Sequence, residues 1–392
     1  MTQARPMPIH MRRDGFDPPA ELAAVRDGAG LTRVPTLFGT SAWLVTRHAD
    51  VREVMADAVR FSNAARPPGF PALGGPDTEG SLLLSDPPEH TRLRKLLSPE
   101  FTVRRIRRLE PRITEIVEDH LAAMEAAGPP ADLVPAFALP VPSLVICELL
   151  GVPYADRAEF QGRAGRQLDV SLDLEERRRA GAESRAYMAE LVARTRVEPG
   201  EDLLGMLVRE HGDDLTSGEL TGIASLLLIA GHETTANTIG LGVLALLRAP
   251  DQLRLVRDRS EAVEAAVDEL LRYLSVVHSG MPRFATQDTV LAGERIAAGD
   301  MVILSLPAAN RDPEIGDDLD TLDVTRAITR HVAFGHGVHH CIGAPLARTE
   351  LRIALPALLR RFPSLALADP EAEIDFRSYN VVYGVRSLPV SW

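Results

Sequence analysis

The sequence has few cysteines and no uninterrupted apolar run long enough to cross a membrane. Its two cysteines, Cys147 and Cys341, are far apart in a chain of 392 residues, so a disulfide framework is absent and a reducing compartment fits. The first 22 residues mix arginine, aspartate and proline, and they resemble neither a signal peptide nor an anchor. The sequence therefore predicts a cytoplasmic protein that is not held in a membrane.

Basic charge is also scarce. The chain has 43 basic residues, of which only Lys95 is lysine, against 55 acidic residues, which gives a formal net charge of −12. This is the wrong sign for a general nucleic-acid binder or for a protein attached to an anionic membrane. Hydrophobic residues at 45% and charged residues at 25% are typical of a globular protein, which excludes disordered and fibrous classes.

Helical periodicity dominates the sequence, and only short segments alternate in the manner of strands. The expected fold class is mainly α with small β-sheets, and neither a linker nor a repeat divides the chain. The Pro- and Gly-rich segment 66–80 is expected to be a loop that serves as a substrate lid. The expected strands are 42–46, 289–291 and 301–306, and the expected helices include 98–127, 142–150 and 173–194.

The clearest predicted helix begins at Thr216 and runs to about Arg248. Thr216 and Glu219 have the spacing of a capping box, and the pair Ala249-Pro250 ends the pattern. A helix of this length spans roughly 48 Å, which is enough to cross a whole domain. Because polar residues at 231–238 interrupt its apolar sequence, we expect the helix to be buried in protein, with its polar middle facing an interior site.

The strongest chemical signal is the segment 334–343, Phe-Gly-His-Gly-Val-His-His-Cys-Ile-Gly. Its glycines allow tight turns, and Pro345 suits the first turn of a following helix, so Cys341 is expected at a helix N-terminus. There the helix dipole favours the thiolate form that a metal needs as its ligand. Two other interpretations stay open at this point: a buried structural cysteine, and a zinc site shared with the nearby histidines.

This segment resembles the haem-binding signature of the cytochrome P450 family, Phe-x-x-Gly-x-His-x-Cys-x-Gly. Every specified position is matched, the last by Gly343. The resemblance implies that Cys341 is the thiolate ligand of the iron of haem b, that Phe334 packs beneath the porphyrin, and that His339 binds a haem propionate. An axial thiolate donates electron density that assists O–O cleavage.

A second segment, Glu269-Leu270-Leu271-Arg272, places an acid and a base three residues apart on one face of a helix. Taken alone, this spacing is typical of a surface ion pair. In a chain that also has the cysteine segment, it resembles the family's Glu-x-x-Arg pair. The resemblance implies that Glu269 and Arg272 support the haem-binding core and have no catalytic role.

The polar middle of the long helix reads Ala230-Gly231-His232-Glu233-Thr234. A threonine inside a helix commonly donates to the carbonyl one turn back, and a zinc-protease motif would need histidine at position 236, which is alanine. The segment resembles instead the family's Ala/Gly-Gly-x-Asp/Glu-Thr motif. The resemblance implies that Gly231 lets the helix bulge to admit dioxygen, that Thr234 supports oxygen activation and orders a water, and that Glu233 links this water to bulk protons.

The two propionates of a haem need cationic or hydrogen-bonding partners when they are buried. His90 and Arg94 are four residues apart on a predicted helix that follows Asp86, and they resemble the family's propionate ligands. Arg283 resembles a third. Together with His339, these residues would supply four partners for two carboxylates.

Because the motifs follow the family order, the resemblance predicts one haem domain, residues 38–392, whose long helix crosses the haem, preceded by an N-terminal extension, residues 1–37. It implies a monomeric monooxygenase that uses dioxygen, two electrons and protons to hydroxylate, epoxidise or dealkylate a mid-sized apolar substrate, such as a macrolide, terpenoid or steroid. The alternatives are a non-catalytic haem-thiolate sensor and a peroxide-driven peroxygenase, neither of which is expected to need the pair Glu233 and Thr234.

By the same resemblance, several mostly apolar segments form the substrate pocket. They are 66–84, 162–183, 226–234, 276–280 and 380–383, with Ala230, Val276, Val277 and Val382 as candidate contacts. No flavin- or dinucleotide-binding segment is evident, so electrons are expected from a separate ferredoxin with its own reductase. The candidate docking residues for this partner are Arg92, Arg104, Arg105 and Arg348.

Overall fold

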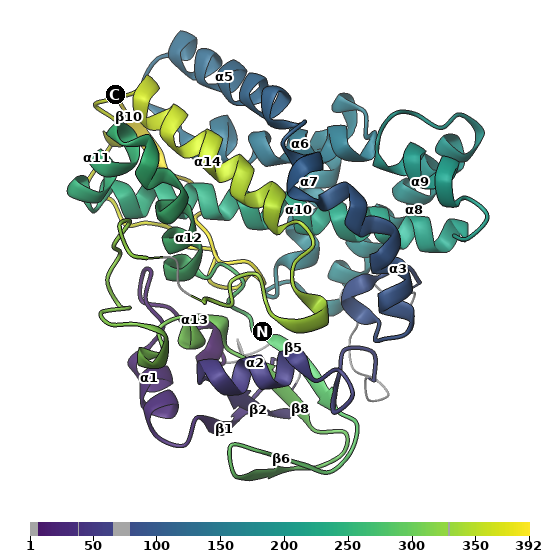
Figure 1. The fold of residues 1–392 in the computed structure, drawn as a ribbon. Coiled ribbons are helices and arrows are strands. Elements are labelled where there is room, and N and C mark those ends of the chain that lie inside the picture. Colours follow the sequence, from purple (N-terminus) through teal and green to yellow (C-terminus); the bar gives the residue numbers. More distant parts are fainter. Residues whose placement is uncertain (1–6, 38, 66–78, 328–329) are drawn as a thin grey trace. The chain divides into compact units, whose positions relative to one another are not determined.

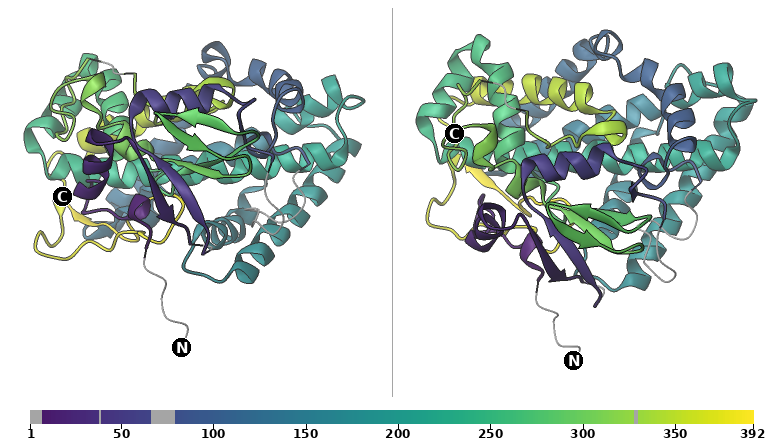
Figure 2. Two further views of the ribbon diagram at one scale, coloured as in Figure 1. Left: turned by 90° about the horizontal axis from the view of Figure 1, so that it is seen from below. Right: turned by 60° about the horizontal axis from the view of Figure 1, so that its bottom comes forward.

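The computed structural model describes residues 7–37, 39–65, 79–327 and 330–392, and the chain divides into two compact units. Unit 1 comprises Met1–Phe70, Glu264–Cys341 and Phe376–Gly384, and unit 2 comprises Pro71–Val263, Ile342–Asp375 and Val385–Trp392. Unit 1 contains the largest described sheet, whereas unit 2 is built mostly of helices (Figures 1 and 2). The predicted class, mainly α with small β-sheets, is confirmed.

The five-stranded sheet of unit 1 has the strand order β1-β2-β8-β5-β3, in which β2 and β8 are parallel and the other neighbours are antiparallel. The edge strand β1 comes from the predicted N-terminal extension. The strands are β1 Leu31–Pro35, β2 Ser41–Val45, β3 Phe61–Ser62, β5 Met281–Ala285 and β8 Met301–Leu304, with a separate hairpin of β6 Thr289–Leu291 and β7 Glu294–Ile296. All three predicted strand positions are confirmed.

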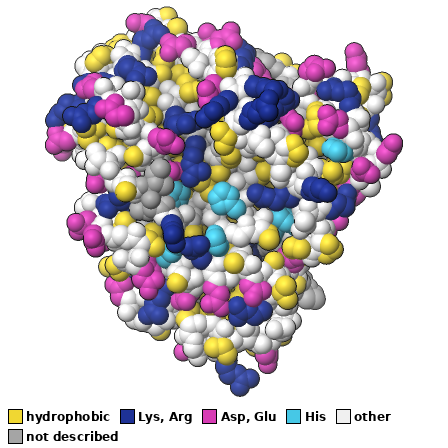
Figure 3. All heavy atoms as spheres, in the orientation of Figure 1, with side chains coloured by type: hydrophobic (Ala, Val, Ile, Leu, Met, Phe, Trp, Pro, Cys, Tyr) yellow, Lys and Arg dark blue, Asp and Glu magenta, His cyan; other side chains and the backbone are white. Residues whose placement is uncertain are grey.

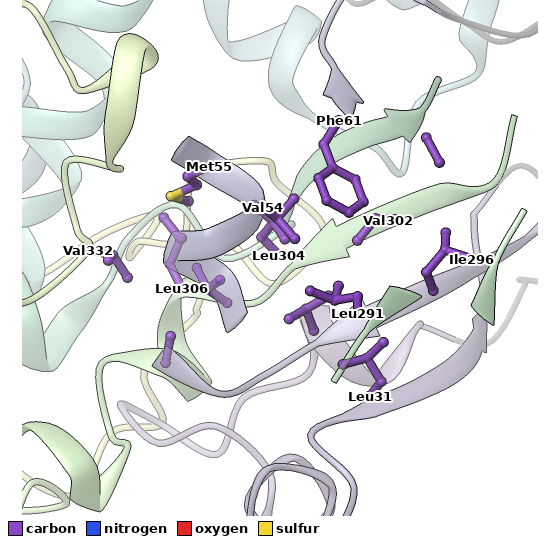
Figure 4. Close-up of a cluster of buried hydrophobic side chains, with 14 residues drawn as sticks. Leu31, Val54, Met55, Phe61, Leu291, Ile296, Val302, Leu304, Leu306 and Val332 are labelled. Atoms are coloured by element: carbon purple, nitrogen blue, oxygen red, sulfur yellow. The ribbon is translucent and has the colours of Figure 1, made fainter. Parts of the chain in front are cut away.

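Two hydrophobic clusters cover the two faces of this sheet, because successive strand residues point to opposite sides. Val45 and Leu304 pack with Val54 of α2 (His48–Ala56) on one face (Figure 4). Leu44, the neighbour of Val45, packs on the other face with Leu22 of α1 (Ala20–Asp27). Each such buried side chain contributes about 1.5–3 kcal/mol, so the two helices are held to the sheet by apolar burial.

Unit 1 also contains short helices and one longer helix that carries the Glu-x-x-Arg segment. They are η1 Ile9–Met11, α12 Val263–Leu274, α13 Leu306–Ala309, η7 Pro313–Ile315 and η8 Gly337–His339. The first residue of α12, Val263, belongs to unit 2, and the rest of the helix lies in unit 1.

The longest helix of the described chain is α10, Ser217–Leu247, in unit 2 (Figure 1). Its capping box is present, with Glu219 N donating to Thr216 Oγ1 at 3.0 Å and Thr216 N donating to Glu219 Oε2 at 2.9 Å. The predicted bounds are therefore correct to within one residue. α10 runs through Gly231 without a break, and the local bulge expected there stays a prediction.

Glycine at position 231 also has a packing reason. A Cβ atom there would lie 2.8 Å from Ile146 Cδ1 on α6 (Pro140–Leu150), closer than real contacts allow. The absence of a side chain therefore lets α10 pack closely on α6 without distorting the helix.

One predicted helix, 98–127, is divided into three. It forms η3 Ser98–Phe101, α4 Val103–Ile106 and α5 Glu110–Ala127. Thr102 starts a new helix because its hydroxyl accepts from Arg105 N at 3.3 Å, and Pro111 lacks the N–H that a continuous helix would need at that position. The periodicity was helical throughout, but these two local signals break it.

The other elements of unit 2 include α6, which starts two residues before its predicted position, and α8 Leu174–Val197, which Asp173 caps by accepting from Glu176 N at 2.7 Å. The remaining helices are η2 Leu82–Leu84, α3 Glu89–Leu97, η4 Val134–Ala138, η5 Tyr154–Asp156, α7 Arg157–Leu168, α9 Leu203–His211, α11 Pro250–Asp258, η6 Ser260–Ala262 and α14 Ala344–Arg361. A small sheet joins β4 Ala131–Asp132, β10 Pro389–Ser391 and β9 Ala366–Leu367.

The predicted lid, 66–80, lies outside the described residues except for its last two, Glu79 and Gly80. These two pack on the first turns of α10, where a Cβ on Gly222 would collide with Glu79 O. Within the described ranges, none of the helices combines the length and the apolar character that crossing a membrane requires.

Candidate functional site

Residues Phe334–Cys341 form a closed loop, which ends the part of unit 1 that spans Glu264–Cys341. Cys341 N donates to Phe334 O at 2.8 Å, and the single turn η8 lies inside the loop. Gly335 and Gly337 have φ values of +72° and +69°, which L-residues rarely adopt, and a Cβ on Gly337 would lie 2.5 Å from Met55 O of α2. Both turns therefore require glycine, which explains this spacing in the sequence.

The two cysteines have different surroundings. Cys147 is buried in α6, and burial raises the pKa of its thiol to about 12, so it behaves as an apolar side chain. Cys341 is exposed. As predicted, a helix follows it, since α14 begins at Ala344 with Pro345 in its first turn. Cys341 is thus the cysteine available as a ligand.

Aromatic and basic side chains accompany Cys341 in unit 1. The ring of Phe334 lies 6.3 Å from the ring of His331 and 6.4 Å from that of His340. Arg283, on β5, is only 3% exposed, and its Nη1 donates to Pro282 O at 3.0 Å. His339 is half-buried in η8. A buried guanidinium is costly unless hydrogen-bonding or anionic partners surround it, so the position of Arg283 suits a carboxylate ligand.

In unit 2, α3 carries the other two predicted propionate ligands, His90 and Arg94, four residues apart on one face. His90 is 1% exposed, and its pKa is lowered first by burial and then by the charge of Arg94. This shift favours the neutral imidazole, which can still donate a hydrogen bond to a carboxylate. Arg94 is half-buried and supplies the positive charge.

The chemistry of these donors fits a haem. A sulfur ligand suits iron, and two histidines with two arginines suit a pair of carboxylates. The predicted residues are divided between the units: unit 1 contains Arg283, Phe334, His339 and Cys341, and unit 2 contains His90, Arg94 and Gly343. A zinc cluster finds no support, because no three His, Cys, Asp or Glu side chains group as metal ligands in the part of the chain that the structure describes.

The Glu-x-x-Arg pair lies in the interior of unit 1 and not on its surface. Arg272 donates to both oxygens of Glu269 at 2.7 Å, and the two residues are 0% and 3% exposed. Arg272 also donates to the carbonyls of Asn310, Leu319 and Thr321. The surface interpretation of this spacing is therefore wrong, and the pair connects α12 to the chain segment 310–321.

The polar middle of α10 contains the acid and the alcohol in different environments. Glu233 is 3% exposed, with Asn237 Nδ2 donating to its Oε2 at 3.3 Å and His232 Nε2 lying 3.8 Å from its Oε1. Thr234 is half-buried, and its hydroxyl donates to Ala230 O at 2.8 Å. Ala230 is exposed although most of α10 is buried, so Ala230 and Thr234 mark the face of the helix that is free to meet a small molecule.

Three of the four proposed substrate contacts lie together in unit 1. Val277 and Val382 form an isolated antiparallel bridge, and Tyr383 N donates to Val276 O at 2.7 Å. The fourth, Ala230, belongs to unit 2. The structure therefore joins the two segments 276–280 and 380–383, which are about a hundred residues apart in the sequence.

Sequence reasoning missed two partners of the site residues. Asn237 is four residues after Glu233 on the same helix, a spacing that could have suggested their contact. Arg326, whose Nε donates to Glu269 Oε1 at 3.2 Å, is 57 residues away and has no local signal. The acid of the Glu-x-x-Arg pair thus binds two arginines.

Comparison with known proteins extends these observations to the whole chain. The family model of cytochrome P450 matches residues 36–160 and 194–378. Cytochrome P450 FAS1 of Rhodococcoides fascians is 50% identical, over 98% of both chains. Cytochrome P450 165B3 of Amycolatopsis orientalis is 47% identical, over the full length of both.

Solved structures agree with this result. P450 StaH from the biosynthesis of the glycopeptide antibiotic A47934 is 49% identical and superimposes with a TM-score of 0.88, over 98% of this chain and 100% of that chain. CYP105P1 in complex with filipin I is 44% identical, with a TM-score of 0.91 over 97% of both chains. The chain therefore belongs to the cytochrome P450 family and is a haem-thiolate monooxygenase that contains haem b.

Proposed function

We propose that Cys341 is the thiolate ligand of the haem iron. The observation that carries this assignment is the loop closed by the hydrogen bond from Cys341 N to Phe334 O, with two glycines in left-handed turns. The exposed thiol of Cys341 supports it, because Cys147 is buried and held neutral. Phe334 would then pack beside the porphyrin, and Gly343 would end the loop before α14.

We assign the haem propionates to His90, Arg94, Arg283 and His339. Two of these side chains, His90 and Arg283, are almost fully buried, at 1% and 3% exposure. Polar groups at such depth need hydrogen-bonding partners, and a carboxylate offers several acceptor sites. Arg94 and Arg283 would balance the two negative charges.

When bound, a thiolate-ligated haem activates dioxygen so that one oxygen atom enters the substrate and the other leaves as water. The role proposed for Thr234 is to hold a water and a proton at the site of oxygen activation. Its hydroxyl hydrogen is directed to Ala230 O, so its oxygen lone pairs are available to accept from a water. Glu233 would then pass protons to this water, and Asn237 holds the Glu233 carboxylate in place through its hydrogen bond to Oε2.

The proposed substrate is a mid-sized apolar secondary metabolite. Ala230, Val276, Val277 and Val382 are apolar, and the bridge between Val277 and Val382 joins two of these contacts. Relatives support this class. One is pentalenic acid synthase of Streptomyces avermitilis, at 44% identity, and another is the P450 in complex with filipin I.

The proposed electron donor is a ferredoxin with a separate reductase, and we propose that the enzyme acts as a cytoplasmic monomer. Of the four candidate docking residues, Arg92 binds Glu89 at 2.7 Å and Arg105 binds Glu100 at 2.7 Å. These ion pairs reduce the positive charge that the two arginines offer to an acidic partner. Arg104 and Arg348 complete the proposed docking surface.

Labelled dioxygen tests this proposal. A compound selected by its binding difference spectrum is incubated with the protein, ferredoxin, reductase, NAD(P)H and ¹⁸O₂. We expect one ¹⁸O atom in each product molecule. A sensor would form no product, and a peroxygenase would form product from added peroxide without ferredoxin or NAD(P)H, so either result would overturn the proposal.

A further inference from the structure

The N-terminal segment Ile9–Asp17 contacts both chain segments that carry the proposed substrate contacts. Those segments are 275–280, which follows α12, and 380–383 near the C-terminus. All of these residues belong to unit 1. The contacts converge on Arg13 and Tyr383, which neither the family motifs nor the proposed chemistry uses.

Arg13 caps the C-terminus of α12. Its Nη2 donates to Leu274 O at 3.2 Å and to Ser275 O at 2.8 Å, while its Nη1 donates to Phe16 O at 2.9 Å. The last carbonyls of a helix have no intrahelical donors, and a cation is favourable beside them because of the helix dipole. A residue from the N-terminus of the chain therefore satisfies the end of the helix that contains Glu269 and Arg272.

The chain leaves α12 through a conformation that needs this support. Ser275 has φ of +41°, in the left-handed region that is unfavourable for a residue with a Cβ atom. Three bonds hold it there: Ser275 Oγ donates to Arg272 O, Asn310 Nδ2 donates to Ser275 Oγ, and Arg13 binds its carbonyl. Because Val276 is the next residue, this turn sets the direction in which Val276 and Val277 leave the helix.

Tyr383 connects Arg13 to the second segment. The Arg13 guanidinium lies over the Tyr383 ring, 5.1 Å from its centroid, and Tyr383 Oη donates to Gly15 O at 2.7 Å. The backbone of Tyr383 donates to Val276 O at 2.7 Å, next to the bridge between Val277 and Val382. Arg13 and Tyr383 thus fix the two segments relative to each other from the side of the N-terminal segment.

Two buried histidines strengthen the same junction. His278 is 0% exposed, and its Nε2 donates to Asn380 O at 2.7 Å, which joins the two segments once more. Its ring lies 5.0 Å from that of Tyr383. His10, in η1, is 4% exposed and hydrogen-bonds to the backbone of Ser279. Each segment is therefore held at more than one point.

We propose that Arg13 is a positioning residue for substrate recognition, which acts through Ser275 and Tyr383 to place Val276, Val277 and Val382. This inference rests on the proposed substrate contacts. Arg13 does not itself touch the substrate. Its removal would leave the haem ligand unchanged and would let the apolar contacts shift, so the affinity for bulky apolar ligands should fall more than the affinity for small ones.

Two azole probes separate these effects. Imidazole reports mainly on binding at the haem iron, whereas clotrimazole adds three aromatic rings that must contact the surrounding pocket. We expect Arg13→Met to raise the dissociation constant of clotrimazole about tenfold or more, because it removes several hydrogen bonds of a charged donor, and to change that of imidazole less than about twofold. Arg13→Lys keeps a cation near Leu274 O and Ser275 O but loses the planar fork, so it should restore part of the loss.

Arg12→Met is the matched control, because Arg12 is exposed and forms an ion pair with Glu21, which is also exposed. It should leave both constants unchanged. Tyr383→Phe removes only the bond to Gly15 O and provides a milder variant, which should weaken clotrimazole binding in the same direction. The carbon-monoxide band of each variant reports whether the thiolate-bound haem is intact.

The role of Arg13 would be overturned if the ratio of the clotrimazole dissociation constant to the imidazole dissociation constant were the same in the wild type, Arg13→Met and Tyr383→Phe. Arg13→Met could also weaken the binding of both azoles equally and diminish the carbon-monoxide band, which would indicate damage to the haem site. Tyr383→Phe then decides: the role of Arg13 is supported if this variant changes the ratio of the two dissociation constants with its band intact, and it is overturned if the ratio is unchanged. A wild-type protein that binds neither azole and shows no carbon-monoxide band would overturn the haem assignment, and the role of Arg13 with it.

Discussion

Thr234 and Glu233 are neighbours on α10, but their surroundings differ. The hydroxyl of Thr234 is half-buried on the face that also exposes Ala230, whereas the Glu233 carboxylate is buried and contacts Asn237 and His232. A helix turns about 100° per residue, so the two side chains point to different sides. This geometry is compatible with the role in oxygen activation that we propose for Thr234, and it places Glu233 in the protein interior.

Thr234→Ala should separate oxygen consumption from product formation. If the hydroxyl only binds Ala230 O, the variant should lose little stability and keep the same coupling. If it holds a proton at the oxygen site, the variant should bind substrate and oxidise NAD(P)H, yet release hydrogen peroxide in place of product. Product, peroxide and NAD(P)H oxidation are measured together, with Thr234→Ser as the control that keeps the hydroxyl. Unchanged coupling in Thr234→Ala would contradict the assignment.

Glu233→Gln tests the other half of this pair. It keeps the shape of the side chain and removes the ionisable group, so oxygen-dependent turnover should slow while substrate binding is retained. A turnover rate equal to that of the wild type would show that protons reach the site by another route.

At the scale of elements, hydrogen bonds join α12 to several separate parts of unit 1. Its acid Glu269 binds Arg272 and Arg326 and accepts from Asp323 N at 3.0 Å, and its C-terminus is capped by Arg13. These bonds tie α12 to the segment 310–326 and to the N-terminal segment. The helix therefore fixes several parts of unit 1 at once.

Glu269→Gln should be strongly destabilising. It leaves two guanidinium groups beside a neutral amide in a buried site, and breaking a buried ion pair in this way costs about 3–5 kcal/mol. Glu148→Gln is the matched control, because Glu148 forms an exposed pair with Arg112, and such pairs contribute about 1 kcal/mol or less. The urea unfolding of the haem-loaded variants measures both effects, and equal losses in the two variants would contradict the structural role of Glu269.

The two buried histidines, His10 and His278, should also make the stability of the folded protein depend on pH. Burial lowers the pKa of His10 to about 4 and, with help from the charge of Arg13, that of His278 to about 3. The unfolded chain protonates these histidines below about 6.5, but the folded protein does not, so stability is lost as the pH falls below this value. Each histidine contributes a slope of up to about 1.4 kcal/mol per pH unit.

Replacing both histidines by glutamine should flatten this slope. Unfolding free energies measured between pH 7 and pH 5.5 compare the wild type with the double variant, in a window where most carboxylates remain ionised. An identical slope in the two proteins would show that the buried histidines do not cause the loss.

Local sequence signals predicted the parts of the site that are contiguous in the chain. The Phe334–Cys341 loop, the capping box of α10 and the helix after Cys341 all follow from neighbouring residues. The contacts of Arg13 with Ser275 and of His278 with Asn380 span 262 and 102 residues and leave no periodic pattern. The close packing of Gly231 on Ile146, which lies on another helix, likewise leaves no signal in the neighbouring sequence.

At the scale of the whole molecule, the excess of acidic residues means that docking of the proposed acidic ferredoxin must depend on local positive charge. The net charge is −12, yet the face drawn in Figure 3 carries basic side chains interspersed with acidic ones. Basic side chains on such a face can attract an acidic partner at short range, within a Debye length of about 10 Å at 0.1 M salt.

Turnover with ferredoxin should therefore weaken as ionic strength rises. The expected change is in the apparent KM for ferredoxin, because screening slows the encounter of charged partners more than later steps. Arg104→Gln should reduce the salt dependence, and Val103→Gln, a neighbouring exposed position without charge, serves as the control. A salt-independent KM for ferredoxin would contradict the electrostatic docking.

The carbon-monoxide spectrum of the reduced protein tests the central claim most directly. A haem bound by the thiolate of Cys341 should give the strongly red-shifted Soret band that this ligation produces, and Cys341→Ser should lose that band because a hydroxyl is a poorer donor to iron. Cys147→Ser should keep it, since Cys147 is buried in α6 and burial keeps its thiol neutral. A red-shifted band that survives in Cys341→Ser would show that another residue binds the iron, and the assignment of the site would be wrong.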